Sequence, residues 1–417
     1  MIVERPLYLQ KLIDSRFNRR IKILTGIRRC GKSFLLFEIY TRWLRNQGVD
    51  ENHIIHIDLE DRRNKQLRDP DNLLEYIDSK IVDSSKYYVM IDEIQHVAEF
   101  EDVLNSYLKI DNVDVYVTGS NSKFLSTDVI TTFRGRGDEI RVYPLSFKEF
   151  YSVYEGTKEA ALNEYMIYGG LPAVLFEKSA EGKSSYLKSV FAHTYVRDIK
   201  ERYQIKNDEV LEDLLNVLAS SIGGLTNPTK LVNTIESVCH IKVNRTTLNN
   251  YLRFICEAYL VTKSERYDVK GKYYLDTPYK FYYTDLGLRN ARLNFRQVEM
   301  THLMENLIFN ELLIRGFNVD VGSVAVNRRN EDGKQVQSRY EIDFVCNQGS
   351  RRYYIQSAYK MINEEKIRQE TMSLRHVDDS FKKIVIVADE TPVIRTEEGI
   401  TFMSLFDFLL LENPLEQ

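Results

Sequence analysis

The chain of 417 residues is longer than one hydrophobic core usually supports, so we expect two to four domains. A formal net charge of -4 argues against nucleic-acid binding through overall charge, although a local basic face is compatible with it. The four cysteines are scattered without metal-ligand spacing, which argues against a disulfide framework and indicates the reducing cytoplasm. No apolar run approaches the length of a membrane span, and residues 1–6 lack the apolar part of a signal peptide, so no membrane partner is expected.

The first candidate site follows a short strand expected over residues 20–25, after a leading helix over residues 7–17. The next eight residues fit the P-loop pattern G-x-x-x-x-G-K-[ST]. Its two glycines allow the loop to turn backbone N–H groups toward a phosphate, at the N-terminus of the helix that follows. We expect Lys32 to reach the β- and γ-phosphates and Ser33 to ligate Mg²⁺. The candidate cofactor-binding residues of the loop and helix are Gly26, Arg28, Arg29, Cys30, Gly31, Lys32, Ser33 and Phe34.

A second strand, over residues 53–59, and an amphipathic helix, over residues 71–84, precede an apolar strand that ends in two acids, Asp92 and Glu93. A buried parallel strand carries its C-terminal residues to the phosphate side of the sheet. Asp92 is placed to hold Mg²⁺ directly or through water, and Glu93 to act as general base on the attacking water. By itself an acidic strand end means little, but after a P-loop the pair is a strong Walker B signal.

The next strand, over residues 113–118, closes into a polar turn that contains Ser120 and Asn121. Either side chain suits contact with a γ-phosphate or with the attacking water, and either suits an N-cap of the following helix; the sequence does not choose. Further along, Arg134 and Arg136 lie on a glycine-containing loop. They suit stabilisation of a transferring phosphoryl group, in the same chain or from a neighbouring subunit, and the alternative is a solvated basic turn.

Six motifs now stand in one order along the chain: the P-loop, Asp92-Glu93, Thr118-Gly119-Ser120, Arg134-Gly135-Arg136, Pro144-Leu145-Ser146-Phe147 and Tyr168-Gly169-Gly170-Leu171-Pro172. With them the whole chain resembles the AAA-type P-loop ATPases of bacteria and archaea that carry a C-terminal DUF4143 domain. The P-loop is common to many families of NTPases, and the later motifs point to this family among them. The resemblance implies ATP and Mg²⁺ as cofactors, an ATPase domain over residues 1–150 and an α-helical lid over residues 151–205.

Residues 206–290 show three helical patterns followed by a β-hairpin, which is the order of a winged helix. The residues that a recognition helix would present to a major groove are Arg245, Thr246, Thr247 and Asn249. DNA is therefore a candidate partner. Because the chain is net acidic, packing against the ATPase domain or contact with a protein is slightly favoured over DNA.

Residues 291–417 are predicted to form a helix, three strands, a helix and a strand, which resembles the PD-(D/E)xK nuclease fold. Asp343 and Glu305 fit two of the acids of such a site. However, Gln356 stands where a second acid belongs and Ala358 where a lysine belongs, with Lys360 two residues further on. We expect this domain not to be an active nuclease.

The chain is thus predicted to be an α/β protein with an AAA-like P-loop domain, a helical lid, a winged-helix domain and a nuclease-like C-terminal domain. Its predicted function is to bind ATP and to hydrolyse it, with the nucleotide state controlling the winged-helix and C-terminal domains. Two alternatives stay open: a DNA-binding or DNA-processing factor, and a slow ATP-dependent switch or scaffold. Besides ATP and DNA, a protein partner or self-association is compatible with the sequence.

Overall fold

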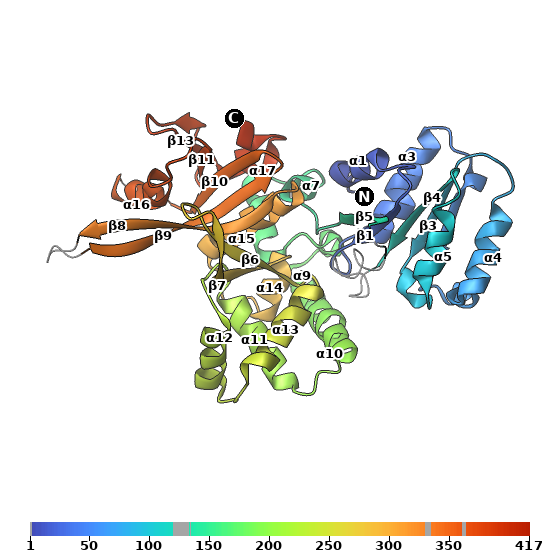
Figure 1. The fold of residues 1–417 in the computed structure, drawn as a ribbon, viewed down its shortest axis with the longest axis horizontal. Coiled ribbons are helices and arrows are strands. Elements are labelled where there is room, and N and C mark those ends of the chain that lie inside the picture. The colour runs from blue at the N-terminus through green and yellow to red at the C-terminus, as the bar shows by residue number, and fades with distance from the viewer. Residues whose placement is uncertain (1, 120–132, 134, 330–334, 361–363) are drawn as a thin grey trace. The chain divides into compact units, whose positions relative to one another are not determined.

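The computed structural model describes residues 2–119, 133, 135–329, 335–360 and 364–417, and the chain divides into two compact units, Met1–Leu145 and Ser146–Gln417 (Figure 1). The first unit is an α/β domain on a five-stranded, fully parallel sheet of order β2-β3-β4-β1-β5. Its strands are β1 (Ile21–Thr25), β2 (Ile54–Asp58), β3 (Tyr87–Asp92), β4 (Val113–Thr118) and β5 (Gly137–Arg141). Its helices are α1 (Pro6–Asp14), α2 (Lys32–Phe34), a π-helical stretch (Leu35–Tyr40), α3 (Thr41–Asn46), α4 (Pro70–Lys80) and α5 (Phe100–Tyr107).

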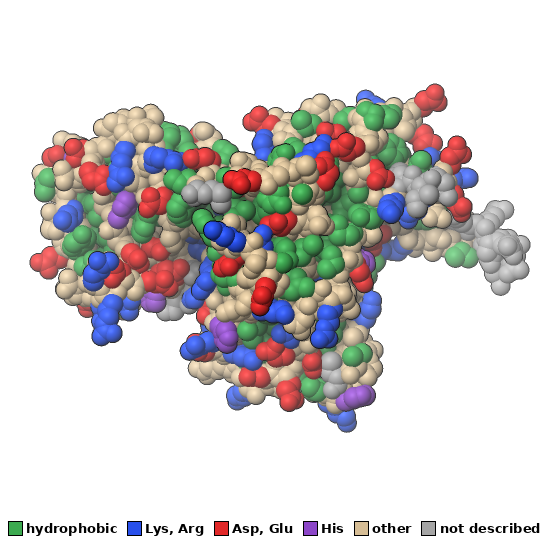
Figure 2. Space-filling view, turned by 180° about the vertical axis from the view of Figure 1, so that it is seen from behind, with side chains coloured by type: hydrophobic (Ala, Val, Ile, Leu, Met, Phe, Trp, Pro, Cys, Tyr) green, Lys and Arg blue, Asp and Glu red, His purple; other side chains and the backbone are tan. Residues whose placement is uncertain are grey.

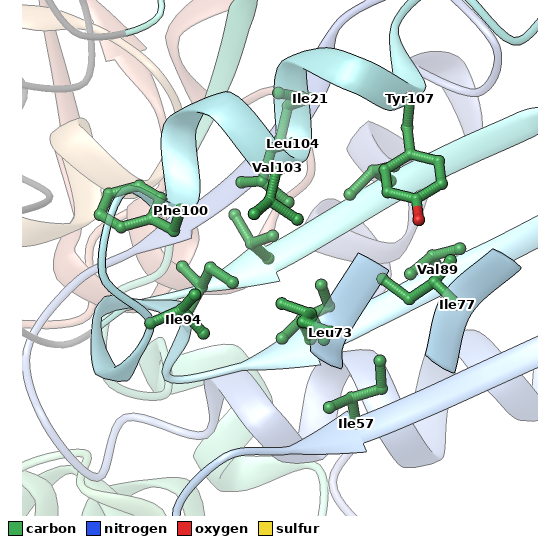
Figure 3. Close-up of a cluster of buried hydrophobic side chains, with 14 of the residues drawn as sticks. Ile21, Ile57, Leu73, Ile77, Val89, Ile94, Phe100, Val103, Leu104 and Tyr107 are labelled. Atoms are coloured by element: carbon green, nitrogen blue, oxygen red, sulfur yellow. The ribbon is translucent and has the colours of Figure 1, made fainter. Parts of the chain in front are cut away.

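The core of the first unit explains why its central strands read as continuous apolar runs. Every residue of β3 and β4 is buried, as expected for parallel strands covered on both faces. On one face, side chains of the sheet such as Ile57 and Val89 pack against Leu73 of α4 and Leu104 of α5 (Figure 3). This packing fixes the sheet, so that the strand ends and the loops after them are held in place.

The second unit is built on one mixed eight-stranded sheet of order β12-β13-β11-β10-β9-β8-β6-β7. Its strands are β6 (Val261–Asp268), β7 (Tyr273–Tyr283), β8 (Asn318–Arg329), β9 (Gln335–Gln348), β10 (Arg351–Ala358), β11 (Lys382–Val387), β12 (Ile394–Arg395) and β13 (Ile400–Ser404). Its helices are α7 (Phe147–Tyr151), α8 (Lys158–Tyr168), α9 (Ala180–Val190), α10 (Arg197–Tyr203), α11 (Asp208–Ser220), α12 (Pro228–Thr234), α13 (Arg245–Glu257), α14 (Leu286–Arg292), α15 (Met300–Ile314), α16 (Glu364–Arg375) and α17 (Leu405–Leu410). No helix among the described residues has the length and apolar character that crossing a membrane requires.

The sequence predicted a domain boundary at residue 290, between the winged helix and the last domain. In the structure, one sheet contains strands from both sides of this boundary. Strand β6 pairs in parallel with β8, with Arg266 opposite Val321, so the hairpin β6–β7 extends the sheet of the C-terminal segment. The predicted lid, winged helix and last domain therefore share one compact unit. Hydrophobic periodicity predicts where strands lie, but it does not reveal which strands pair across an intervening helix.

Two glycine-containing motifs, far apart in the sequence, meet inside the second unit. The backbone N–H of Gly170 donates to Asp285 at 2.7 Å. A methyl group on Gly169 would lie 2.3 Å from Asp285 Oδ1, and one on Gly287 would lie 2.0 Å from the carbonyl oxygen of Tyr168. The close approach explains why neither glycine has room for a side chain, and it joins α8 to the start of α14.

Candidate nucleotide site

The P-loop lies between β1 and α2, as predicted, and both of its glycines are structurally required. Gly26 has φ +135, and a Cβ there would lie only 2.1 Å from the carbonyl oxygen of Val142. Gly31 has φ +95, a left-handed conformation, directly before the helix begins at Lys32. The loop can therefore approach the segment after β5 and still direct its backbone N–H groups inward.

A buried arginine that the sequence did not reveal holds this loop in place. Arg5 donates to the carbonyl oxygen of Cys30 at 3.1 Å and to that of Tyr143 at 2.8 Å. The Cys30 thiol in turn donates to the carbonyl oxygen of Val142 at 3.3 Å. Cys30 thus serves the loop through packing and hydrogen bonding. An arginine in a charged leading segment carries no sequence signal for this role.

Lys32 and Ser33 both point toward the interior of the site. The Lys32 ammonium is buried and donates to the carbonyl oxygens of Gly26 and Ile27 at 3.0 and 3.1 Å, so it spans the loop. The Ser33 hydroxyl donates to Asp92 Oδ1 at 2.9 Å. The two residues predicted to hold Mg²⁺, which are 59 positions apart in the chain, are therefore brought into direct contact.

The remaining predicted residues of the loop and helix are arranged differently. Arg29 has φ 63 and is exposed, and Phe34 is exposed to 42%. Arg28 is partly buried.

Thr118, at the end of β4, connects the two Walker B acids. Its hydroxyl donates to Asp92 Oδ1 and accepts a hydrogen bond from the backbone N–H of Glu93 at 3.1 Å. Burial raises the pKa of Asp92 to about 6, against the lowering effect of the hydrogen bonds from Thr118 and Ser33. A carboxylate beside two hydroxyl groups is an oxygen-rich donor set of the kind that Mg²⁺ prefers, so these residues fit the ion.

Glu93 is buried and adopts a left-handed backbone conformation, with φ 53. Such conformations are uncommon for residues other than glycine and concentrate at functional sites. The side-chain amide of Gln95 donates to Glu93 Oε2, which orients the carboxylate.

Asp58 ends the neighbouring strand β2 in register with Asp92, but its carboxylate accepts from the backbone N–H groups of Glu60 and Asp61. Thr118 and Asp58 have one sequence signal in common: each is a polar residue at the end of an apolar strand.

The predicted γ-phosphate and arginine residues are only partly described. Ser120, Asn121 and Arg134 lie outside the described residues. Arg136 is exposed, and its carbonyl oxygen accepts a hydrogen bond at 3.0 Å from the backbone N–H of Ile21, at the start of β1. The P-loop follows the other end of this strand, about 16 Å away for five residues at 3.3 Å each. Arg136 therefore does not join the site of its own chain, because β5 runs parallel to β1.

Comparison with known protein families agrees with the prediction of a P-loop domain. It gives the segment after this domain a different family assignment from the predicted one. A family described as an AAA domain matches residues 18–151, and this confirms the prediction of an AAA-type P-loop domain. A family described as a domain of unknown function, DUF8612, matches residues 159–299. The predicted DUF4143 assignment is therefore not confirmed.

Two relatives extend over most of the chain. An uncharacterized protein of Haemophilus influenzae is 32% identical over 418 residues, covering 98% of this chain and 99% of the relative. An uncharacterized protein of Methanocaldococcus jannaschii is 28% identical over 362 residues, covering 84% and 77%. Among solved structures, the Aeropyrum pernix Orc1 protein in complex with DNA is 13% identical, with coverage of 70% and 92% and a TM-score of 0.27. A TM-score this low carries no argument about fold or function.

Proposed function

Because the chain belongs to the protein family of its Haemophilus influenzae relative and carries an AAA domain, we propose that it binds ATP with Mg²⁺ and hydrolyses it. The observation that supports this most is the direct contact between Ser33 and Asp92, at 2.9 Å, beside the buried ammonium of Lys32. A hydroxyl, a carboxylate and an ammonium at the N-terminus of a helix match the charges of a magnesium–triphosphate complex.

Each residue has a defined part in the proposed reaction. Lys32 exchanges its two loop carbonyls for β- and γ-phosphate oxygens, and Ser33 and Asp92 supply oxygen ligands to Mg²⁺. When bound, Mg²⁺ stabilises the negative charge that develops on the phosphates. Glu93 takes the proton of the attacking water, and the amide of Gln95 holds the Glu93 carboxylate in orientation. The Thr118 hydroxyl contacts both Asp92, the proposed metal ligand, and the backbone of Glu93, the proposed base, and so fixes their positions relative to each other.

The test is Mg²⁺-dependent release of phosphate from ATP, with nucleotide affinity measured by calorimetry. We expect Lys32→Ala to lose ATP affinity, because the phosphates lose a counter-cation. Glu93→Gln should bind ATP normally but turn it over roughly 10²–10⁴-fold more slowly, since an amide cannot accept the proton. Lys65→Ala removes an exposed lysine outside the site and serves as the matched control. Equal ATP affinity in wild type and Lys32→Ala would refute the proposal.

A second candidate function, DNA binding, is favoured by a polar groove in the second unit. The groove has a volume of about 590 Å³ and lies along α12, the start of α13 and β7. None of the described residues that line it is acidic. On the face of the molecule drawn in Figure 2, basic and acidic side chains are interspersed, which agrees with the small net charge of the whole chain. The lining residues are Asn227, Thr229, Lys230, Asn233, Thr234, Ser237, Arg245 and Thr277. Arg245 is also one of the predicted recognition-helix residues.

We therefore propose that this groove contacts phosphates of duplex DNA, and that ATP in the first unit changes the affinity. Fluorescence anisotropy with labelled duplex DNA, between about 50 and 200 mM salt, should give a steep salt dependence. The double variant Lys230→Ala/Arg245→Ala should bind more weakly and with a shallower slope. The control Lys178→Ala/Lys206→Ala removes the same charge from exposed positions outside the groove. Equal binding by both double variants would reject the groove, and equal affinity with ATP and ADP would reject nucleotide control.

A further inference from the structure

A buried lysine lies among the acids of the nuclease-like segment. The Lys280 ammonium, on β7, is 2.7 Å from Glu305 Oε1 on α15, 2.8 Å from Glu341 Oε1 on β9 and 3.5 Å from Asp343 Oδ1 on β9. The Lys280 side chain is only 2% exposed. Glu305 and Asp343 are the two residues that the sequence placed as acids of a nuclease site. We call Lys280, Tyr282, Glu305, Glu341 and Asp343 the lysine cluster.

Other groups of the protein also donate hydrogen bonds to the acids of the cluster. The Tyr282 hydroxyl donates to Glu305 Oε1 at 2.7 Å, and the backbone N–H of Ser357 donates to Asp343 Oδ2 at 2.9 Å. The side-chain oxygen of Gln356, at the position where an acid was expected, accepts from the backbone N–H of Asp343 at 3.4 Å. Gln356 thus supports the backbone of β9.

We propose that Lys280 is a built-in cation that occupies the centre of this acidic cluster in place of a divalent metal, and that it ties the hairpin β6–β7 to α15 and β9. Buried carboxylates need a compensating charge, and here one ammonium contacts all three. The ammonium lies between the acids, within 2.7–3.5 Å of one oxygen of each, so it occupies the position from which a single divalent ion would contact all three. Among the described residues, no group of three or more acids, histidines or cysteines is arranged to hold a metal ion.

The protonation of the cluster supports the same assignment. Burial would lower the pKa of Lys280, but Tyr282 and the surrounding acids raise it well above its usual range, so the ammonium keeps its charge. Burial, with a contribution from the Glu305 carboxylate, raises the pKa of Asp343 to about 8. The Lys280 ammonium acts in the opposite direction and lowers the pKa of Asp343.

Access to the cluster is closed on the side of Glu305. Gly223, with φ +69 in the turn after α11, lies so close that a Cβ there would be 3.0 Å from both carboxylate oxygens of Glu305. The side chains of Glu305 and Asp343 are 11% and 9% exposed, and that of Glu341 is 31% exposed. Lys360, the alternative lysine, is exposed, with its ammonium 6.0 Å from the centre of the Tyr359 ring. A ligand that approached Glu305 from this side would have to displace the Gly223 turn.

Lys280→Met, which keeps the length of the side chain and removes its charge, tests the proposal, with Mn²⁺ as the probe. We expect its melting midpoint to fall by roughly 6–20 °C, because two buried acids, Glu305 and Asp343, and the partly exposed Glu341 lose their cation. Millimolar Mn²⁺ should restore part of this loss, and the double variant Lys280→Met/Glu305→Gln should show no such recovery. Lys263→Met, an exposed lysine on β6, is the matched control and should change neither property.

The wild-type protein provides a second test that does not depend on a folded variant. Calorimetry with Mn²⁺ should give the same binding for wild type and Glu305→Gln, because the cluster does not hold the ion. Binding that Glu305→Gln abolishes would overturn the proposal, as would DNA cleavage by the wild type that Asp343→Ala abolishes. A folded Lys280→Met that Mn²⁺ does not stabilise would also overturn it. The outcome is independent of ATP hydrolysis in the first unit.

Discussion

At the scale of single residues, one hydroxyl organises the two Walker B acids. Thr118 donates to Asp92 and accepts from the backbone N–H of Glu93, so the residue proposed for the metal and the residue proposed as base share one partner. Asp92 is buried, and a buried carboxylate that loses a hydrogen bond is costly. Thr118 is therefore a positioning residue, and it acts on the reaction through both acids.

Replacing Thr118 by valine tests whether its hydroxyl positions Asp92 and Glu93. Thr118→Val keeps the shape but removes the hydroxyl, and loss of one such bond costs about 1–3 kcal/mol. We expect the Mg²⁺ concentration needed for half-maximal ATP turnover to rise and the maximal rate to fall. Thr118→Ser, which restores the hydroxyl, should recover both. An unchanged Mg²⁺ dependence in Thr118→Val would remove Thr118 from the site.

At the scale of elements, hydrogen bonds and close packing hold the turn after α8 against the start of α14. Asp285 accepts hydrogen bonds from the backbone N–H groups of Gly170 and Leu288, at 2.7 and 3.0 Å. This contact brings together two segments that the sequence singled out separately. The contact depends on close packing as well as on hydrogen bonds, because Gly169 and Gly287 both lie too close to their neighbours to carry a Cβ.

Two glycine variants distinguish close packing from backbone conformation. Gly169 and Gly349 both have positive φ, +74 and +59, but only Gly169 has neighbours within the reach of a Cβ. Gly169→Ala should lower the free energy of unfolding by more than Gly349→Ala, because it adds a clash with Asp285 to the strain of a positive φ, and because φ +74 with ψ −166 is a conformation that essentially only glycine adopts. Urea denaturation of both variants measures the difference. Equal losses would mean that backbone conformation alone requires the glycine.

The same aspartate should make the stability of the second unit depend on pH. Burial raises the pKa of Asp285 from 3.8 to about 6, against the lowering effect of its backbone hydrogen bonds. The folded state therefore binds the proton more tightly than the unfolded state. The stabilisation is fully present below pH 4 and is lost as pH rises through about 6, a change of about 3 kcal/mol.

Comparison with Asp285→Asn isolates this contribution, because asparagine does not titrate. The difference in free energy of unfolding between wild type and Asp285→Asn should favour the wild type more strongly at pH 4.5 than at pH 7.5. Urea denaturation at several pH values measures it. A difference that stays constant over this range would show that Asp285 keeps the same charge in both states.

At the scale of the whole molecule, the parallel sheet of the first unit separates the P-loop from Arg136. Gly137 is in register with Ile21, so Arg136 lies at the start of β1 and the P-loop at its end. An arginine there cannot serve the nucleotide of its own chain, but it can serve the nucleotide of a second copy. We therefore propose that Arg136, with Arg134 as the alternative, stabilises the transferring phosphoryl group of a neighbouring subunit.

Mixing two inactive variants tests this arrangement. Lys32→Ala lacks phosphate binding but keeps the arginines, and Arg134→Ala/Arg136→Ala keeps the P-loop. If the arginines act between copies, the mixture should recover part of the ATP turnover that each variant lacks, and native mass spectrometry should detect an oligomer. Full activity of the double arginine variant alone would contradict the proposal.

The sequence by itself determined the local chemistry of the nucleotide site. The P-loop pattern predicted that Gly26 and Gly31 take up backbone conformations closed to a residue with a side chain and that Lys32 reaches toward the phosphate site, because these properties arise within eight consecutive residues. An apolar strand followed by acids predicted Asp92 and Glu93, because burial on both faces gives a parallel strand its continuous apolar run. Similar short-range patterns predicted most of the helices and strands, but for residues 291–417 they predicted four strands and missed β12, β13 and α17.

Only the tertiary structure decided which distant groups meet. Strand order brings Thr118 to Asp92 and places Arg136 at the end of the strands opposite to the P-loop. Pairing of β6 with β8 merges segments predicted as separate domains, and Lys280 is inserted among acids that the sequence assigned to a metal. Hydrophobic patterns specify which face of an element is buried. They do not specify its neighbour, because many apolar faces are equally able to cover it.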